Sequence, residues 1–263
     1  MHVLDLFSGI GGFALGLESV GMRTAAFCEC EPYAVAVLRK HWPDTPVYPD
    51  VRRLDAAALR RDGVPPPDVI CGGFPCQPFS FAGERRGTAD ERHLWPEFAR
   101  LIGECRPAWV VAENVPGIRS LAADGVLSDL EALGYAYWPV VVGALHAGAA
   151  HRRQRVWFVA TDAARMQRLA QFRDEPDGDV AGVDDVAAAD GARFPDGRTS
   201  GFQEELPVPS SRSWWGAEPD VGRVAHGVPR RVDRLRCLGN AVVPQVVAMI
   251  GAWIMQQHQA EAV

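Results

Sequence analysis

Seven short apolar runs, separated by segments of helical pattern, are the feature that most constrains the fold of this chain. The runs lie at residues 2–7, 23–29, 46–52, 67–73, 108–114, 137–144 and 155–161. Continuously apolar strands that alternate with helices are typical of a parallel sheet covered on both faces. Because crossovers between parallel strands are right-handed, the alternation predicts an α/β, doubly wound, Rossmann-like sheet.

Composition divides the rest of the chain into two further parts. Residues 161–220 hold 13 acidic against six basic residues, with many turn formers, which is typical of a loop or a partly flexible insert. From residue 221 a basic run leads to a Gly-Asn turn and then to an apolar helix from about Pro244. We therefore predict one domain of residues 1–160 plus 237–263 and a small, irregular second region of residues 161–236.

The net charge of −6 gives no overall attraction for nucleic acid, so any contact with DNA must come from a local patch. The dense basic run consists of Arg223, Arg230, Arg231, Arg234 and Arg236. The acidic insert would be repelled by phosphates, and we expect DNA contact in the arginines instead. The alternative is that these arginines form ion pairs with the insert.

Several classes of protein are disfavoured by the sequence. No run of about 18 apolar residues is present, so we expect no membrane span, and the first residues lack the basic start of a signal peptide. The six cysteines show neither a paired framework nor a zinc-binding spacing. We expect a cytoplasmic monomer without a metal ion.

Residues suited to a nucleoside cofactor follow three successive strands. The glycine-rich turn DLFSGIGG (Asp5–Gly12) lets the backbone approach a ligand, although such turns are common. Glu29 follows the second strand, where a carboxylate can bind ribose hydroxyls, and Asp50 ends the third, where it can accept a bond from an adenine amino group. The alternatives are a helix N-terminal carboxylate for Glu29 and a turn residue for Asp50. Together the three features favour a nucleoside-type cofactor.

The stretch GGFPCQPFS (Gly72–Ser80) holds Cys76 between two prolines. Pro75 and Pro78 restrict the backbone around the thiol, so that the side chain is held in one direction, as a nucleophile requires. Cys71 lies inside the preceding apolar run and is expected to be a buried small hydrophobe. The pattern therefore indicates a reactive role for Cys76 alone.

Charged residues also flank two later strands. Glu113 directly follows the apolar run WVVA, where burial of an unpaired carboxylate is costly, and pairing with Arg155 would remove that cost. Arg153 and Arg155 could instead be a solvated pair beside a strand. We predict that the thiol, the carboxyl group and the two guanidinium groups converge at one edge of the sheet.

The motifs DLFSGIGG, GGFPCQPFS, ENVPG, RRQRVWFV and GNAVVPQVVAMIG, in this order, resemble the DNA (cytosine-5)-methyltransferase family, in its bacterial or phage type. The resemblance covers about residues 1–160 and 235–255. It implies a methyltransferase sheet, S-adenosylmethionine as methyl donor, and a target cytosine flipped out of double-stranded DNA, in a restriction-modification setting. His151 stands where the family usually has glutamine, and the target-recognition region is short.

The resemblance also implies roles for individual residues. Cys76 would be the nucleophile, Glu113 would contact the ring N3 and Arg155 the O2, and Arg153 would lie near the target base or the DNA backbone. The positions that match cofactor contacts are Phe7, Gly9, Gly11, Gly12, Glu29, Asp50, Leu94, Asn240 and Ala241. The positions that match substrate contacts are Pro75, Gln77, Ser80 and Asn114.

Two alternatives to DNA methylation stay open. One is an RNA cytosine-5 methyltransferase of similar architecture, against which the stretch PCQPFS favours DNA. The other is a non-catalytic interaction protein, which would be expected to lose the thiol or the carboxylate, whereas this chain keeps both. The favoured hypothesis is therefore methyl transfer to C5 of a cytosine in DNA through a covalent adduct between Cys76 and C6.

Overall fold

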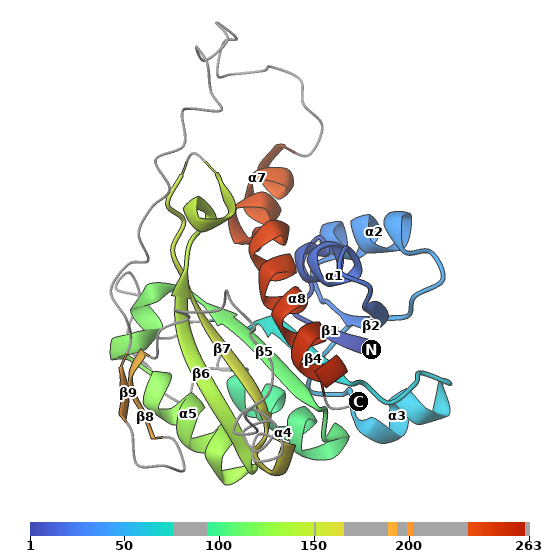
Figure 1. The fold of residues 1–263 in the computed structure, drawn as a ribbon. Helices are drawn as coiled ribbons and strands as arrows, with labels where there is room; N and C mark the ends of the chain where they lie inside the picture. The colour runs from blue at the N-terminus through green and yellow to red at the C-terminus, as the bar shows by residue number, and fades with distance from the viewer. Residues whose placement is uncertain (76–93, 150, 166–188, 194–198, 202–230, 261–263) are drawn as a thin grey trace, which may run out of the picture.

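A seven-stranded sheet with the order β3-β2-β1-β4-β5-β7-β6 forms the centre of the protein. It is seen in a computed structural model that describes residues 1–75, 94–149, 151–165, 189–193, 199–201 and 231–260 (Figure 1). The strands are β1 (His2–Leu6), β2 (Arg23–Cys28), β3 (Val47–Tyr48), β4 (Val69–Gly73), β5 (Trp109–Asn114), β6 (Tyr135–Val142) and β7 (Arg155–Asp162).

Helices cover both faces of this sheet, as the apolar strands require. The α-helices are α1 (Gly12–Glu18), α2 (Pro32–His41), α3 (Ala56–Arg61), α4 (Trp95–Cys105), α5 (Ala123–Ala132), α7 (Arg231–Asn240) and α8 (Pro244–Ala260). Helices α1 and α8 lie on one face, and α3, α4 and α5 lie on the other (Figure 1). Their buried side chains form two separate core clusters. The prediction of a doubly wound α/β sheet is confirmed.

The direction of β7 differs from the prediction of an all-parallel sheet. β7 pairs antiparallel with both β5 and β6, whereas the pairs among β1 to β5 are parallel. A parallel neighbour requires a long crossover, usually an α-helix. The connection from β6 to β7 carries the short 3₁₀ helix η3 (Ala144–Ala147) in its described residues, so the chain turns back instead.

Three smaller elements were also not predicted. The acidic segment, expected as a loop, contains the two antiparallel strands β8 (Ala189–Arg193) and β9 (Thr199–Gly201). Helix α3 follows Asp55, whose carboxylate accepts the Ala58 N–H at 2.6 Å and so caps the helix. The expected Gly-Asn turn is instead the last turn of α7, a segment rich in the helix formers arginine and leucine.

Helix α8 is the longest helix in the described part of the chain and packs against α1. By length and composition, the helical stretch Val232–Gln259 could cross a membrane, because an 18-residue window within it has a mean hydropathy of 1.6. In the structure, 28% of that window is buried, and Val246, Val247 and Ile254 of α8 pack against α1 and the sheet. The same packing brings the segment before α8 to the glycine-rich turn.

Candidate active site

The glycine-rich turn between β1 and α1 crosses the carboxyl edge of the sheet, next to β4. This is the point at which the strand order reverses and where ligands bind in doubly wound sheets. Gly9 and Gly11 have φ values of 54° and 86°, and Phe7 has a φ of 53°, which is uncommon for a residue with a side chain. The Phe7 ring stacks on Phe98 of α4 with the centroids 6.3 Å apart. The described residues leave open space beside Gly9, because none of their atoms lies within 4 Å of a Cβ placed there.

Glu29 ties this turn to the end of β2. One carboxylate oxygen accepts the Gly9 N–H at 2.7 Å, and the other accepts the Glu31 N–H at 2.7 Å. Glu31 is the N-cap residue of α2. Glu29 therefore also lies next to a helix N-terminus, as the alternative prediction for Glu29 stated. The carboxylate thus fixes the position of the turn, and its contact with a ribose stays a prediction.

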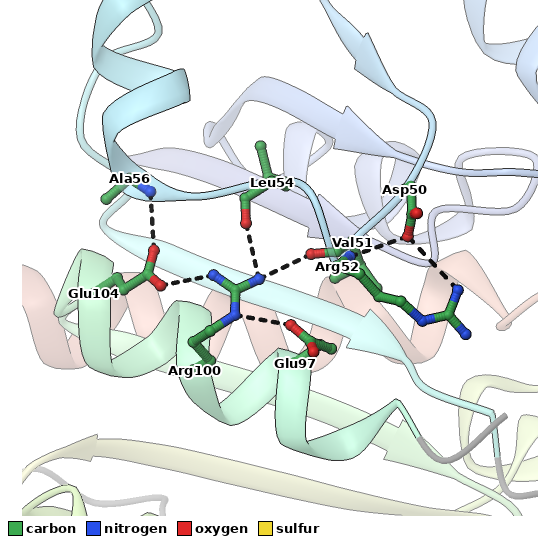
Figure 2. A network of polar contacts seen from close by, with 8 residues as sticks. All are labelled: Asp50, Val51, Arg52, Leu54, Ala56, Glu97, Arg100 and Glu104. Carbon is green, nitrogen blue, oxygen red and sulfur yellow. Dashed lines mark hydrogen bonds and ion pairs between the residues drawn. The ribbon is translucent and has the colours of Figure 1, made fainter. Parts of the chain in front are cut away.

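The loop after β3 is held by an arginine from α4 (Figure 2). Arg100 donates from Nη2 to the carbonyls of Val51 at 3.0 Å and Leu54 at 2.9 Å. Its other nitrogens bond to Glu97 at 2.8 Å and Glu104 at 2.6 Å, both on α4. Three polar contacts from α4 therefore fix the loop that begins at Asp50: the two that Arg100 donates to Val51 and Leu54, and the one that Glu104 accepts from the Ala56 N–H at 3.0 Å.

Asp50 itself lies in a turn and is only partly buried. Its carboxylate accepts the Arg52 N–H at 3.0 Å, and its carbonyl accepts the Arg53 N–H at 3.1 Å. The backbone of Asp50 thus forms a turn, as the alternative prediction for this residue stated. The side chain lies at the same edge of the sheet as Glu29, and its contact with an adenine stays a prediction.

Glu113 and Arg155 form an ion pair at the junction of β5 and β7, as predicted. Arg155 Nε lies 2.9 Å from Glu113 Oε1, and the carboxylate side chain is 9% exposed. Burial raises the pKa of Glu113 to about 7, although the nearby charges of Arg155 and Arg153 act to lower it. A glycine opposite the carboxylate provides the space, because a Cβ at Gly73 would lie 2.9 Å from Glu113 Oε2. The carboxyl group can therefore gain or lose a proton near neutral pH.

Asn114 fixes the start of the loop that follows β4. Its Nδ2 donates to the Phe74 carbonyl at 2.9 Å, and its Oδ1 accepts the Val115 N–H at 2.9 Å. The Phe74 ring packs on Trp95 with the centroids 5.0 Å apart, which holds the same loop from the other side. The prediction for Asn114 was a contact with the substrate, and the structure shows a bond that positions the loop carrying Pro75.

Replacing Asn114 with aspartate is expected to lower kcat about 100-fold, because a displacement near 1 Å of a reacting group can cost that much. Aspartate keeps the oxygen that accepts from Val115 but has no donor for the Phe74 carbonyl. Binding of S-adenosylhomocysteine, measured by calorimetry, is expected to stay at the wild-type affinity. A variant with wild-type kcat would contradict the positioning role of this bond.

Three of the predicted site residues lie outside the described residues: Cys76, Gln77 and Ser80. The structure places the chain up to Pro75, directly beyond the carbonyl that Asn114 holds. Leu94 immediately precedes α4 and packs, partly buried, against the core. The expectation that Cys71 is a buried small hydrophobe is confirmed by its 0% exposure.

The predicted cofactor-closing residues Asn240 and Ala241 join α7 to α8. Asn240 is exposed, and the Ala241 N–H donates to the Cys237 carbonyl at 2.9 Å. Arg153 reaches the same segment, donating from Nη2 to the carbonyls of Gly239 and Ala241, each at 2.6 Å. Arg153 therefore binds main chain from another part of the protein, a contact that the sequence did not predict.

Sequence reasoning missed two residues that shape this edge, Phe98 and Arg100. Both lie on α4, and both act on segments more than 40 residues away in the chain. In a sequence, an arginine flanked by glutamates on a helix is typical of an exposed face with ion pairs along the helix. No local sequence pattern therefore indicates that Arg100 bonds to the loop after β3. In the described part of the chain, no group of three or more His, Cys, Asp or Glu side chains is arranged to hold a metal ion.

The sequence matches a protein-family model and several curated proteins. The family model described as C-5 cytosine-specific DNA methylase matches residues 1–187. The Type II methyltransferase M.Eco47II of Escherichia coli is 38% identical over 165 residues, which are 60% of this chain and 39% of that protein. The Type II methyltransferase M.HgiBI of Herpetosiphon aurantiacus is 37% identical over 161 residues, 59% of this chain and 36% of that protein.

A solved structure resembles this fold over a longer range. It is a putative DNA modification methyltransferase encoded within a prophage of E. coli, with a TM-score of 0.55 and 26% sequence identity. The match covers 79% of this chain and 62% of that one. The chain spans little more than a third of the length of the two curated relatives.

Proposed function

Because the chain belongs to the C-5 cytosine-specific DNA methylase family, we propose that it transfers a methyl group from S-adenosylmethionine to C5 of a flipped-out cytosine in double-stranded DNA. The observation that carries the proposal is the ion pair between buried Glu113 and partly buried Arg155, next to the loop that leads to Cys76. The Type II methyltransferases among the relatives suggest a restriction-modification setting.

The residues at the carboxyl edge of the sheet fit a nucleoside cofactor. The turn at Gly9 has open space beside it, and the Glu29 carboxylate borders this turn. Each Glu29 oxygen that accepts one backbone N–H keeps a lone pair for a ribose hydroxyl. Asp50 would contact the adenine, and Phe7, Gly11, Gly12, Leu94, Asn240 and Ala241 would complete the pocket. When bound, S-adenosylmethionine supplies a methyl group on a positively charged sulfur.

The protein residues would make C5 of cytosine reactive towards that methyl group. The Cys76 thiolate adds to C6, and the electron pair of the C5–C6 double bond becomes available at C5. Protonated Glu113 donates to N3, where negative charge develops, and Arg155 donates to O2. After C5 has gained the methyl group it loses its proton, the double bond forms again, and the thiolate leaves. Glu113 has a pKa of about 7, which suits it to donate this proton at neutral pH.

We also propose a role for each part of the chain. Residues 1–160 plus 237–263 would form the catalytic domain, and residues 161–236 a short target-recognition region. Most of that region lies outside the described residues, and Arg231, Arg234 and Arg236 lie on α7. Arg236 Nη1 lies 3.3 Å from Glu31 Oε2 of α2. We further propose a cytoplasmic monomer without a metal ion.

The test of this function is transfer of labelled methyl groups from S-adenosylmethionine to nucleic acids by the purified chain. The substrates are mixed-sequence duplex DNA, the corresponding duplex RNA, and bulk transfer RNA. We expect label in the DNA alone, located on cytosine C5. Label in RNA alone would favour an RNA cytosine methyltransferase, and binding of S-adenosylhomocysteine without transfer would favour a non-catalytic scaffold.

A further inference from the structure

Trp42, the residue that follows α2, packs its indole ring against the glycine-rich turn. A Cβ at Gly11 would lie 2.6 Å from two carbons of this ring, Cη2 and Cζ3, which is closer than a Cβ atom approaches other atoms in folded proteins. The edge of the ring therefore occupies the place that a side chain at position 11 would need. Gly11 also has a φ of 86°, so the turn requires glycine here for two independent reasons.

The indole ring is held in place by contacts with α1 and β2. Its Nε1 donates to Glu18 Oε2 at 2.9 Å, and Glu18 is the last residue of α1. The other carboxylate oxygen of Glu18 accepts the Thr24 N–H of β2 at 3.3 Å. The ring of Phe27, also on β2, meets Trp42 edge to face with the centroids 5.3 Å apart. The bond to Glu18 and the packing on Phe27 together fix the orientation of the ring towards Gly11.

The glycine-rich turn is therefore supported at two points by side chains from the segment of β2 and α2. Glu29 accepts the Gly9 N–H at 2.7 Å, and Trp42 packs against Gly11. Gly9 and Gly11 both have positive φ values, and glycine adopts positive and negative φ about equally readily. The residues of the turn alone do not favour its observed shape, so contacts from outside the turn have to select it.

We propose that Trp42 is a positioning residue for the cofactor: its ring, oriented by Glu18, holds Gly11 in the conformation that binds S-adenosylmethionine. A turn that already has its binding conformation loses little conformational freedom when the ligand binds, and this preorganisation raises the affinity. The inference deepens the proposed function and rests on it, because that function places the cofactor at this turn.

The first measurement is amide hydrogen exchange of residues 7–12 in the ligand-free protein. In Trp42→Leu we expect these amides to exchange about 10-fold faster than in the wild type, because the turn samples other conformations once the ring is absent. The matched control is Trp138→Leu on β6, which also replaces a partly buried tryptophan; its ring packs on Trp253 with the centroids 5.8 Å apart. This control should leave the exchange of residues 7–12 at the wild-type rate.

The second measurement is the affinity for S-adenosylhomocysteine, by calorimetry at a temperature at which thermal unfolding shows each variant to be folded. We expect Trp42→Leu to bind about 10-fold more weakly than the wild type, because ligand binding then has to order the turn. Trp138→Leu should keep the wild-type affinity. Trp42→Phe keeps an aromatic ring without the N–H that bonds to Glu18, so we expect an intermediate loss. It replaces Trp42→Leu in both measurements if the leucine variant does not fold.

A double-mutant cycle tests the contact between the ring and the turn. Gly11→Ala is expected to weaken binding in the wild-type background, because the added Cβ meets the ring and the φ of 86° is strained for alanine. In the Trp42→Leu background the Cβ no longer meets the ring. The loss of affinity in the double variant should therefore be smaller than the product of the two separate losses.

Wild-type affinity in a folded Trp42→Leu variant, or an equal loss in Trp42→Leu and Trp138→Leu, would overturn the positioning role and leave the proposed function intact. Losses that multiply in the double variant would also count against it, because they would show that Trp42 does not act through Gly11. Failure of the wild-type chain to bind S-adenosylhomocysteine would instead contradict the proposed function, and with it the role of Trp42 towards a cofactor. The exchange measurement uses no ligand and reports separately whether Trp42 holds the turn.

Discussion

Replacing Cys76 with serine is expected to abolish methyl transfer while binding of S-adenosylhomocysteine persists. A hydroxyl is far less ionised than a thiol at neutral pH and would not add to cytosine C6, so the loss is on the order of 10⁴-fold or more. The substitution leaves both prolines that flank Cys76 in the sequence unchanged. Folding should therefore be unaffected, because the cofactor edge is built by other segments.

The adduct itself provides the measurement. In duplex DNA that carries 5-fluorocytosine, fluorine replaces the C5 proton that must leave, so the covalent complex accumulates and resists denaturation. We expect this complex with the wild type and with Cys105→Ser, a thiol that is partly buried on α4, and no complex with Cys76→Ser. Wild-type activity in the serine variant would contradict a covalent mechanism, and an unfolded variant would indicate a structural cysteine.

The second large effect is expected for Glu113→Gln, which should lower kcat about 10³-fold, within the range found for loss of a general acid. Glutamine fills the same space opposite Gly73 and can bond to Arg155, but it cannot deliver a proton to N3 of cytosine. Glu131→Gln, an exposed position on α5, is the matched control and should keep wild-type kcat. Equal kcat in Glu113→Gln and the wild type would remove Glu113 from the mechanism.

The same variant has an expected effect on stability that depends on pH. The pKa of Glu113 is raised from 4.5 to about 7, so the folded protein holds this proton more tightly than the unfolded chain does. The free energy of unfolding therefore falls as the pH rises from about 4.5 to about 7, by about 3 kcal/mol for this group, and is level above that range. Denaturant unfolding at pH 5 and pH 8 should show this difference in the wild type relative to Glu113→Gln. The same pH dependence in both proteins would indicate that burial does not control this carboxyl group.

Much of the fold could be predicted, because segments that are buried in a fold are apolar in the sequence. Apolar runs identified the strands, and the cost of burying Glu113 predicted its pairing with Arg155. The direction of β7 could not be predicted, because an apolar run indicates a strand but not the direction in which it runs. That direction depends on the connection after β6, which contains a 3₁₀ turn in its described residues.

The contacts that complete the candidate site could not be predicted for a different reason. Arg153 binds carbonyls 86 and 88 positions away, and Arg100 binds carbonyls 46 and 49 positions away. Every residue has a main-chain carbonyl, so the sequence does not indicate which carbonyls an arginine side chain will bind. Asn114 shows the same limit, since its motif suggested a substrate contact and its amide holds the Phe74 carbonyl.

If this chain methylates C5 of cytosine in DNA, nucleoside mass spectrometry will identify the modified nucleoside. Unmethylated duplex DNA is incubated with the purified chain and S-adenosylmethionine, then digested to nucleosides, with the Cys76→Ser variant as the matched control. We expect 5-methyl-2′-deoxycytidine with the wild type and none with the variant. Methylation on the exocyclic N4 of cytosine or on adenine, or 5-methyl-2′-deoxycytidine in equal amounts with both proteins, would contradict it.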